Sequence, residues 1–236
     1  QGEKIFATLF TYEAGGGPLW LVLADGARQP DGSFQGTLYR VSGPVFNASP
    51  WTAATETAVG TMRLAFPSTE RATLTYTYGG TTVTKEIQRQ RFSPQRTACA
   101  WSAFDRSYAT NFQDLWWNPT EPGWGINLAH QGDTIFATLF TYGADGRGTW
   151  FVMSDGARQA GTLNFTGTLY RTSGPAFDAS PWAATTATPA GTMTLAFASG
   201  NRATLTYTLD GVTVTKSIQR QVFASPATQC EAVDED

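Results

Sequence analysis

The chain has 236 residues, of which 41% are hydrophobic and 15% charged, and its formal net charge is −3. Nucleic-acid binding requires a basic face and anionic membranes attract clustered lysines and arginines, so this composition argues against both as partners. No apolar run approaches the roughly 18 residues that a membrane-spanning helix needs. We expect a secreted or cell-surface protein, with the periplasm as an alternative, because two cysteines in a Thr-, Gly- and Trp-rich β chain fit an oxidising compartment.

An internal repeat is the main feature of the sequence. The second half repeats segments of the first half almost residue for residue, so the chain arose by duplication. The clearest pairs are residues 5–12 with 135–142, 36–40 with 167–171, 71–77 with 202–208, 87–90 with 218–221, and Cys99 with Cys230. We therefore expect module 1 over residues 1–99, a linker over 100–114, module 2 over 115–230 and an acidic tail over 231–236.

Taken in chain order, module 1 begins with strand-like sequence, and its glycine-rich residues 14–17 predict a hairpin loop. The pair Gly79-Gly80 predicts a two-residue turn, because such turns need positive φ, and the pair at 210–211 predicts the same in module 2. Alternation of apolar residues with threonines over 202–209 is typical of a strand. The strands expected in module 2 are residues 124–130, 134–142, 149–154, 164–172, 191–198, 202–209 and 212–223, with a further piece near Trp182.

These strands predict an all-β protein of two tandem antiparallel barrels, each of about seven or eight strands. We prefer an up-and-down barrel to a sandwich, because closure removes exposed edges. Module 1 has no counterpart of the strand at 124–130, so we expect it to lack its first strand. Three explanations stay open: the strand was trimmed, another chain donates it, or the 100–130 segment serves both modules.

Two resemblances bear on these modules. Residues 116–125, Trp-Trp-Asn-Pro-Thr-Glu-Pro-Gly-Trp-Gly, resemble repeats of secreted bacterial proteins of no known function. Trp124 at the start of a first strand and Arg220 in a last strand resemble the calycin barrels, the lipocalins and avidins. That resemblance implies a contact between Trp124 and Arg220 at the closed end, and binding of a small ligand inside the barrel. Module 1 keeps the equivalent Arg89.

Aromatic residues are the candidate ligand-binding residues. Indole rings beside an amide and a carboxylate suit sugar rings, although the same cluster could pack as a plug on the barrel end. Two further tryptophans follow Ala-Ser-Pro in the longest loops, where each is either an exposed contact or a lid over a barrel mouth. The candidates are Trp116, Trp117, Asn118, Glu121 and Trp124 in the cluster, and Trp51 and Trp182 in the loops.

Other repeated residues are structural candidates. Asp25 and Asp155 precede glycine and predict turns, with ion pairs to Arg28 and Arg158, or to Arg89 and Arg220, as the alternative. Cys99 and Cys230 either form a disulfide with each other or are free or separately paired thiols. Lys216 and Arg220 alternate with apolar residues and so either line a cavity or reach the barrel ends. The single histidine, His130, is expected to be solvated or capping at a strand end.

We expect no catalytic residue, metal ligand or cofactor, because no histidine-based triad, zinc-ligand spacing or phosphate loop occurs. The sequence favours a non-catalytic secreted binding or adhesion protein whose ligand is a carbohydrate surface or a small apolar molecule. The alternative is a structural protein whose copies assemble into filaments by strand donation. A glycosidase-like hydrolase is third, because paired carboxylates would be required.

Overall fold

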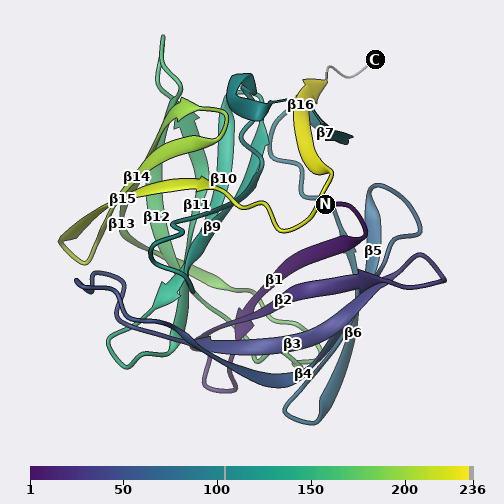
Figure 1. Ribbon diagram of the computed structural model, residues 1–236. Helices are drawn as coiled ribbons and strands as arrows, with labels where there is room; N and C mark the ends of the chain where they lie inside the picture. Colours follow the sequence, from purple (N-terminus) through teal and green to yellow (C-terminus); the bar gives the residue numbers. More distant parts are fainter. Residues whose placement is uncertain (104, 234–236) are drawn as a thin grey trace.

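The computed structural model describes residues 1–103 and 105–233, and its regular structure is β-strand apart from one short 3-10 turn, η1 (Arg106–Tyr108). Module 2 forms a closed antiparallel barrel (Figure 1). The barrel closes because β8 pairs with both β9 and β15. Its strands are β8 (Asp114–Trp117), β9 (Gly125–Gln131), β10 (Thr134–Tyr142), β11 (Gly148–Arg158), β12 (Asn164–Ser173), β13 (Thr186–Ser199), β14 (Arg202–Leu209) and β15 (Val212–Arg220).

Period-two alternation fills the interior of this barrel. In β14 the side chains of Ala203, Leu205 and Tyr207 are buried, whereas the threonines between them face outward. The turn that follows has Asp210 at φ 49° and Gly211 at φ 84°, as a tight hairpin requires. The seven strands predicted in module 2 are therefore present, with shifted bounds, and so is the hairpin at 210–211, whereas the further piece near Trp182 is not a strand.

Module 1 is an open, curled sheet of six strands in the order β1 to β6, and in this chain it does not close into the second barrel that we expected. Its strands correspond in order to β10–β15, so both β8 and β9 lack counterparts, whereas we expected one missing strand. The bounds are β1 (Lys4–Tyr12), β2 (Pro18–Arg28), β3 (Phe34–Ser42), β4 (Thr55–Ala65), β5 (Arg71–Tyr78) and β6 (Thr81–Gln88).

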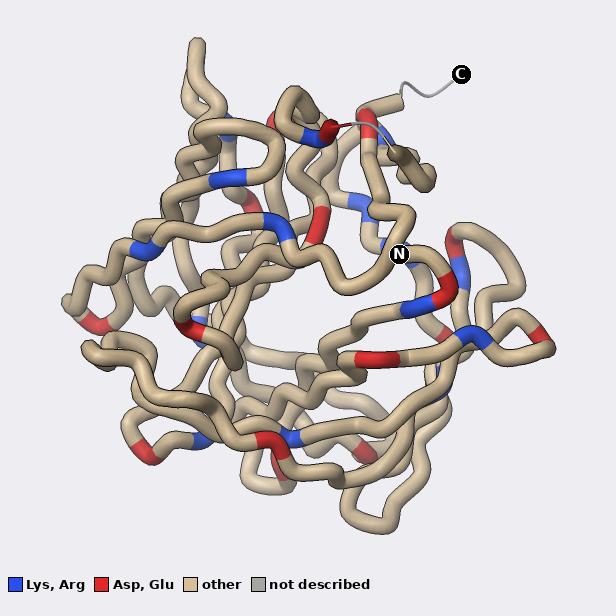
Figure 2. Tube along the Cα trace, viewed as in Figure 1, with Lys and Arg blue, Asp and Glu red and all other residues tan. Residues whose placement is uncertain are grey.

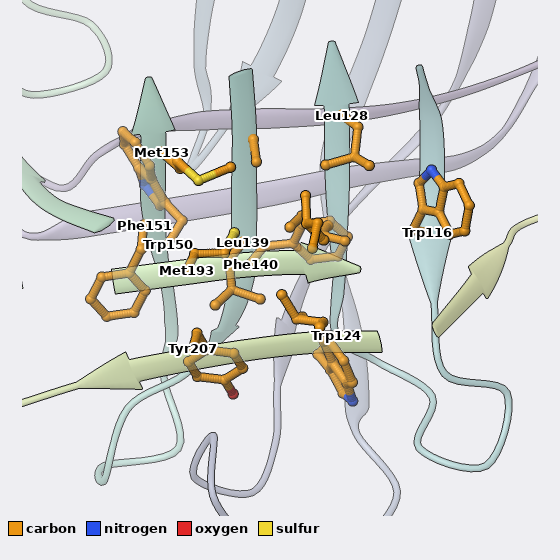
Figure 3. Packing of buried hydrophobic residues seen from close by; sticks show 14 of the residues in the cluster. Trp116, Trp124, Leu128, Leu139, Phe140, Trp150, Phe151, Met153, Met193 and Tyr207 are labelled. Atoms are coloured by element: carbon orange, nitrogen blue, oxygen red, sulfur yellow. The ribbon is translucent and has the colours of Figure 1, made fainter. Parts of the chain in front are cut away.

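The two modules pack through equivalent residues, as two subunits would in an isologous dimer. The Trp20 indole Nε1–H donates to the carbonyl of Thr141 at 3.1 Å, and that of Trp150 donates to the carbonyl of Thr11 at 3.3 Å. Phe140 of β10 lies 5.1 Å from Trp20, measured between ring centroids, and joins the core shown in Figure 3. One hydrophobic cluster therefore spans both modules.

Each module also sends its long loop across to the other module. In the loop 43–54, Phe46 lies 6.2 Å from Tyr207 between centroids and accepts a hydrogen bond from its hydroxyl. In the equivalent loop 174–185, Phe177 lies 6.3 Å from Tyr76 and accepts the same bond. The loop of module 1 thus covers one end of the module 2 barrel, and the loop of module 2 covers one end of the module 1 sheet.

A two-stranded ribbon of β7 (Arg96–Ser102) and β16 (Ala227–Val233) joins the ends of the two repeats. A disulfide links Cys99 to Cys230 across it, so the first of the two predicted alternatives holds. The ribbon includes residues 100–102 of the predicted linker and 231–233 of the predicted tail, and residues 234–236 lie outside the described part of the chain.

Figure 2 shows the charged residues of the described ranges scattered along the chain, with no single basic or acidic face in that view. In the part of the chain that the structure describes, no helix has the length and hydropathy that crossing a membrane would require.

Candidate functional site

Residues 111–131, which we call the closing segment, contain β8 and β9 and complete the barrel of module 2. The Phe112 ring stacks on Phe197 with centroids 3.6 Å apart and an interplanar angle of 2°. Trp116 and Ile126 of the same segment are fully buried in the core. The closing segment therefore supplies both the last two strands and a large share of the barrel's apolar contents.

Arg220 at the end of β15 holds the start of the closing segment. Its guanidinium donates to the carbonyls of Asn111 at 2.7 Å and Gln113 at 3.0 Å, and to the Asp114 carboxylate at 3.1 Å. Burial lowers the pKa of Arg220, and the adjacent Asp114 opposes that effect. This buried cation is thus compensated by acceptors that come almost entirely from the closing segment.

A second ion pair holds the middle of the closing segment at the other end of the barrel. The Lys216 ammonium lies 2.7 Å from one Glu121 oxygen, and the other oxygen accepts from the Trp124 indole at 3.2 Å. The Lys216 ammonium also lies 5.7 Å from the centroid of Trp51, which comes from module 1. Trp51 donates to the carbonyl of Pro122 at 3.0 Å, so the crossing loop covers this end.

In module 1 the equivalent residues are present but uncovered. Phe66 is 49% exposed where its counterpart Phe197 is 6% exposed, and Ile87 is 40% exposed where Ile218 is 3% exposed. Arg89 and Lys85 correspond to Arg220 and Lys216. We call Phe66, Lys85, Ile87 and Arg89, with the edges of β1 and β6, the acceptor face.

A cavity of about 810 Å³ lies beside the acceptor face, between the modules and the disulfide-linked ribbon. Ile5 of β1, Thr69 and Arg89 line it from module 1, and Asp114 lines it from module 2. The space next to Arg89 is therefore open, whereas the space next to Arg220 is filled by the closing segment.

The residues of the predicted ligand-binding cluster are largely engaged inside the protein. Figure 3 shows Trp116 and Trp124 within the buried core, so neither presents an indole face at the surface. The oxygens of Asn118 and Glu121 accept bonds from Thr120, Trp124 and Lys216 inside the protein, and Trp117 is partly buried. The alternative of a plug packed on the barrel therefore fits these residues.

The loop tryptophans differ from each other. Trp51 is partly buried against Trp124 and Tyr142, as a lid would be. Trp182 is 45% exposed, and the Lys85 ammonium lies over its ring at 4.7 Å from the centroid. The difference arises because module 1 has no described counterpart of Trp124 for Trp182 to pack on.

Two sequence interpretations need correction. Asp25 and Asp155 lie inside β2 and β11, where the pairing with the neighbouring strands shifts register, and not in turns. The expected ion pairs are also not formed, since Asp25 pairs with Lys4, Arg28 with Glu3 and Arg158 with Asp133. Asp155 is exposed.

The contact implied by the calycin resemblance is also different from the one observed. Arg220 lies over the ring of Trp116, 5.1 Å from its centroid, and Trp124 packs near the opposite ion pair of Glu121 and Lys216. Trp116 lies on β8, a strand that the sequence did not predict. This pair was missed because Trp124 was taken as the first tryptophan of the barrel.

His130 is buried, so the expected solvated position is wrong, and its ring bonds backbone groups near the end of its strand, as the capping alternative has it. Its Nδ1 accepts a hydrogen bond from the Phe112 amide at 2.9 Å, and its Nε2 lies 2.8 Å from the carbonyl of Gly132. Nδ1 is therefore unprotonated and Nε2 carries the hydrogen. Burial, the largest effect, lowers the pKa of His130 to about 4. His130 thus anchors the start of the closing segment.

Within residues 1–103 and 105–233, no group of three His, Cys, Asp or Glu side chains is arranged to hold a metal ion. Comparison of the chain with protein-family models, with curated proteins and with solved structures gave no match. The functional argument therefore rests on the chain's own repeat, in which module 2 provides the reference for module 1.

Proposed function

We propose that this chain is a non-catalytic, secreted assembly protein in which module 1 takes up β-strands from a neighbouring chain. The observation that carries the proposal is the exposure of Phe66 and Ile87, two core-type residues whose counterparts are buried in a completed barrel. Soluble proteins rarely leave such residues uncovered beside unpaired strand edges, because both favour association.

Strand addition satisfies both needs of the acceptor face at once. An incoming strand forms main-chain hydrogen bonds with the edges of β1 or β6, and its side chains cover the apolar face. The disulfide between Cys99 and Cys230 supports an oxidising compartment, and hence secretion.

The test is the mass distribution of the purified protein over a range of concentrations, by light scattering with negative-stain imaging. We expect mass to rise with concentration and the Ile87→Lys variant to remain monomeric, because a lysine there repels an apolar strand. The matched control is Val212→Lys, since Val212 is 41% exposed but lies at a hairpin of module 2. A wild-type protein that stays monomeric at every concentration contradicts strand donation between copies of this chain.

Ligand binding is our second candidate function, and Trp182 is the residue that favours it. An exposed indole beside the Lys85 ammonium offers stacking and a hydrogen-bond donor to a carbohydrate or a small apolar molecule. A glycan and small-ligand screen with Trp182→Ala as the negative control tests this. Equal binding by the wild type and by Trp182→Ala counts against this site.

A further inference from the structure

The molecule contains a template for the missing part of module 1. We propose that the acceptor face binds a two-stranded segment of another chain with the chemistry of residues 111–131, in which an aspartate pairs with Arg89 and a glutamate pairs with Lys85. This inference rests on the proposed function, because it requires module 1 to take up strands, and it adds the identity of what is taken up.

Arg89 is held in the same way as its counterpart in the completed barrel. Its Nε donates to the carbonyl of Thr69 at 2.7 Å, as Nε of Arg220 donates to the carbonyl of Gly200. In Arg220 the two terminal nitrogens bind the closing segment. Within the described residues, those of Arg89 make no hydrogen bond, and Arg89 lines the cavity, so an incoming carboxylate would meet a guanidinium that its Nε already holds in place.

Lys85 is placed like Lys216, which holds the middle of the closing segment in module 2. Its ammonium lies over the Trp182 ring, as that of Lys216 lies over Trp51. Lys216 is also neutralised by Glu121, whereas Lys85 has no carboxylate partner in the described part of the chain. An occupant with a glutamate at this position would supply that partner.

The apolar part of the acceptor face matches an aromatic residue. Phe34 and Phe66 meet edge to face with centroids 6.3 Å apart, as Phe165 and Phe197 do at 6.1 Å. In module 2 this pair receives the ring of Phe112. An occupant with an aromatic residue two positions before its aspartate would cover Phe66 in the same way.

The two cations make the site selective among strands. Any extended peptide could satisfy the edges of β1 and β6, but an apolar strand would bury Arg89 and Lys85 without acceptors, at a substantial desolvation cost. The spacing of the two acids, seven residues apart in the closing segment at Asp114 and Glu121, then sets the register.

The experiment uses the whole protein and a fluorescent synthetic peptide of residues 111–131, with binding followed by anisotropy. We expect saturable binding of one peptide per chain, on the order of 10 µM, because folding on binding reduces the affinity that the contacts alone would give. Hydrogen exchange should slow in β1 and β6. A scrambled peptide of the same composition should not bind.

Charge variants test the two ion pairs. We expect the D114N peptide to bind about tenfold more weakly to the wild type, and Arg89→Ala to weaken the native peptide equally. Combining the two changes should add little further loss, as coupled partners require. The E121Q peptide and Lys85→Ala should behave in the same way. Arg202→Ala removes an exposed arginine on β14 and should leave binding unchanged.

A chain with residues 111–130 copied in front of Gln1 provides a second, independent arm. Its module 1 should close and should no longer bind the peptide. The inference is overturned if this chain binds the peptide as the wild type does, if the scrambled peptide binds equally well, or if protection arises in β10 and β15, where the peptide would have replaced the closing segment of module 2.

The outcomes also separate this inference from the proposed function. Self-association that the peptide does not inhibit would reject the occupant and keep strand uptake. Peptide binding by a protein that remains monomeric would support the occupant and reject donation between identical chains. Absence of both would reject the two proposals together.

Discussion

Arg89 and Arg220 occupy equivalent positions in the two repeats but have opposite surroundings. Arg220 is buried and donates to acceptors of the closing segment, whereas Arg89 is exposed beside a cavity. The same sequence motif is therefore buried and fully hydrogen-bonded in module 2 and exposed in module 1, where we propose that it binds a donated strand.

This pair gives a matched prediction for stability. Arg220→Ala should lower the free energy of unfolding by about 3–5 kcal/mol, because it leaves the carbonyls of Asn111, Gln113 and Gly200 without their donor and removes one of the two arginines that pair with Asp114. Arg89→Ala should lower it by about 0.5 kcal/mol or less, as exposed substitutions usually do. Urea denaturation of the two variants is the measurement. Equal losses would contradict the different roles that we assign.

His130 predicts how stability depends on pH. Its pKa falls from 6.5 to about 4 on folding, so the unfolded chain binds the proton more tightly. His130 therefore does not reduce the free energy of unfolding above about pH 6.5. As the pH falls from 6.5 toward 4, its preference for the proton in the unfolded chain lowers the free energy of unfolding by up to about 3 kcal/mol. Protonation of Nδ1 would break its bond to the Phe112 amide.

The measurement is the free energy of unfolding of the wild type and His130→Gln between pH 4.5 and 7.5. The variant should be less stable at neutral pH and should have a shallower slope below pH 6.5. If both proteins lose stability in parallel, carboxylates and not His130 determine the acid sensitivity.

At the level of strands, sequence reasoning worked where the pattern was long and regular. The hairpin of β14 and β15 could be predicted from alternating Thr and apolar residues around Asp210-Gly211. The four-residue β8 could not, because Asp-Leu-Trp-Trp has no alternation and its partners β9 and β15 lie on opposite sides in sequence. Because β8 was not predicted, the sequence indicated one missing strand in module 1, whereas two are missing.

Contacts between modules were also beyond the sequence. Trp51 was recognised as a contact or a lid, but its partners Trp124 and Tyr142 lie in the other module. Periodicity describes one strand and its own sheet, and it carries no information on which loop covers which barrel. The burial of His130 was not predicted either, because its partner Phe112 lies eighteen residues away in sequence and periodicity does not report such a contact.

The ribbon of β7 and β16 depends on its disulfide. Replacing both Cys99 and Cys230 by serine should lower the free energy of unfolding by about 2–4 kcal/mol, because the bond closes a loop across most of the chain. Limited proteolysis should then cut near residues 96–102 before the barrel unfolds. A single Cys99→Ser variant should match the double variant. Unchanged cleavage would show that other contacts hold the ribbon.

For the whole molecule, the shared core predicts a single cooperative unit. Trp20 of module 1 is fully buried against Phe140 and Tyr142 of module 2. Trp20→Ala should lower the free energy of unfolding by about 3–5 kcal/mol. Hydrogen exchange should accelerate in both β5 and β14, and calorimetry should show one transition in both proteins. Two separate transitions, with only module 1 affected, would contradict a common core.

The loops 43–54 and 174–185, each of which covers the other module, also set the order in which the two modules can be completed during synthesis. The loop that covers the barrel of module 2 leaves the ribosome before that barrel exists, so the barrel can close onto a finished cover. The loop with Phe177 and Trp182, which covers module 1, emerges long after β6. Module 1 therefore stays without the cover of this loop until the first half of module 2 has been synthesised. During this interval Tyr76 and Tyr78, which Phe177 covers in the final structure, are exposed to chaperones and to sibling chains.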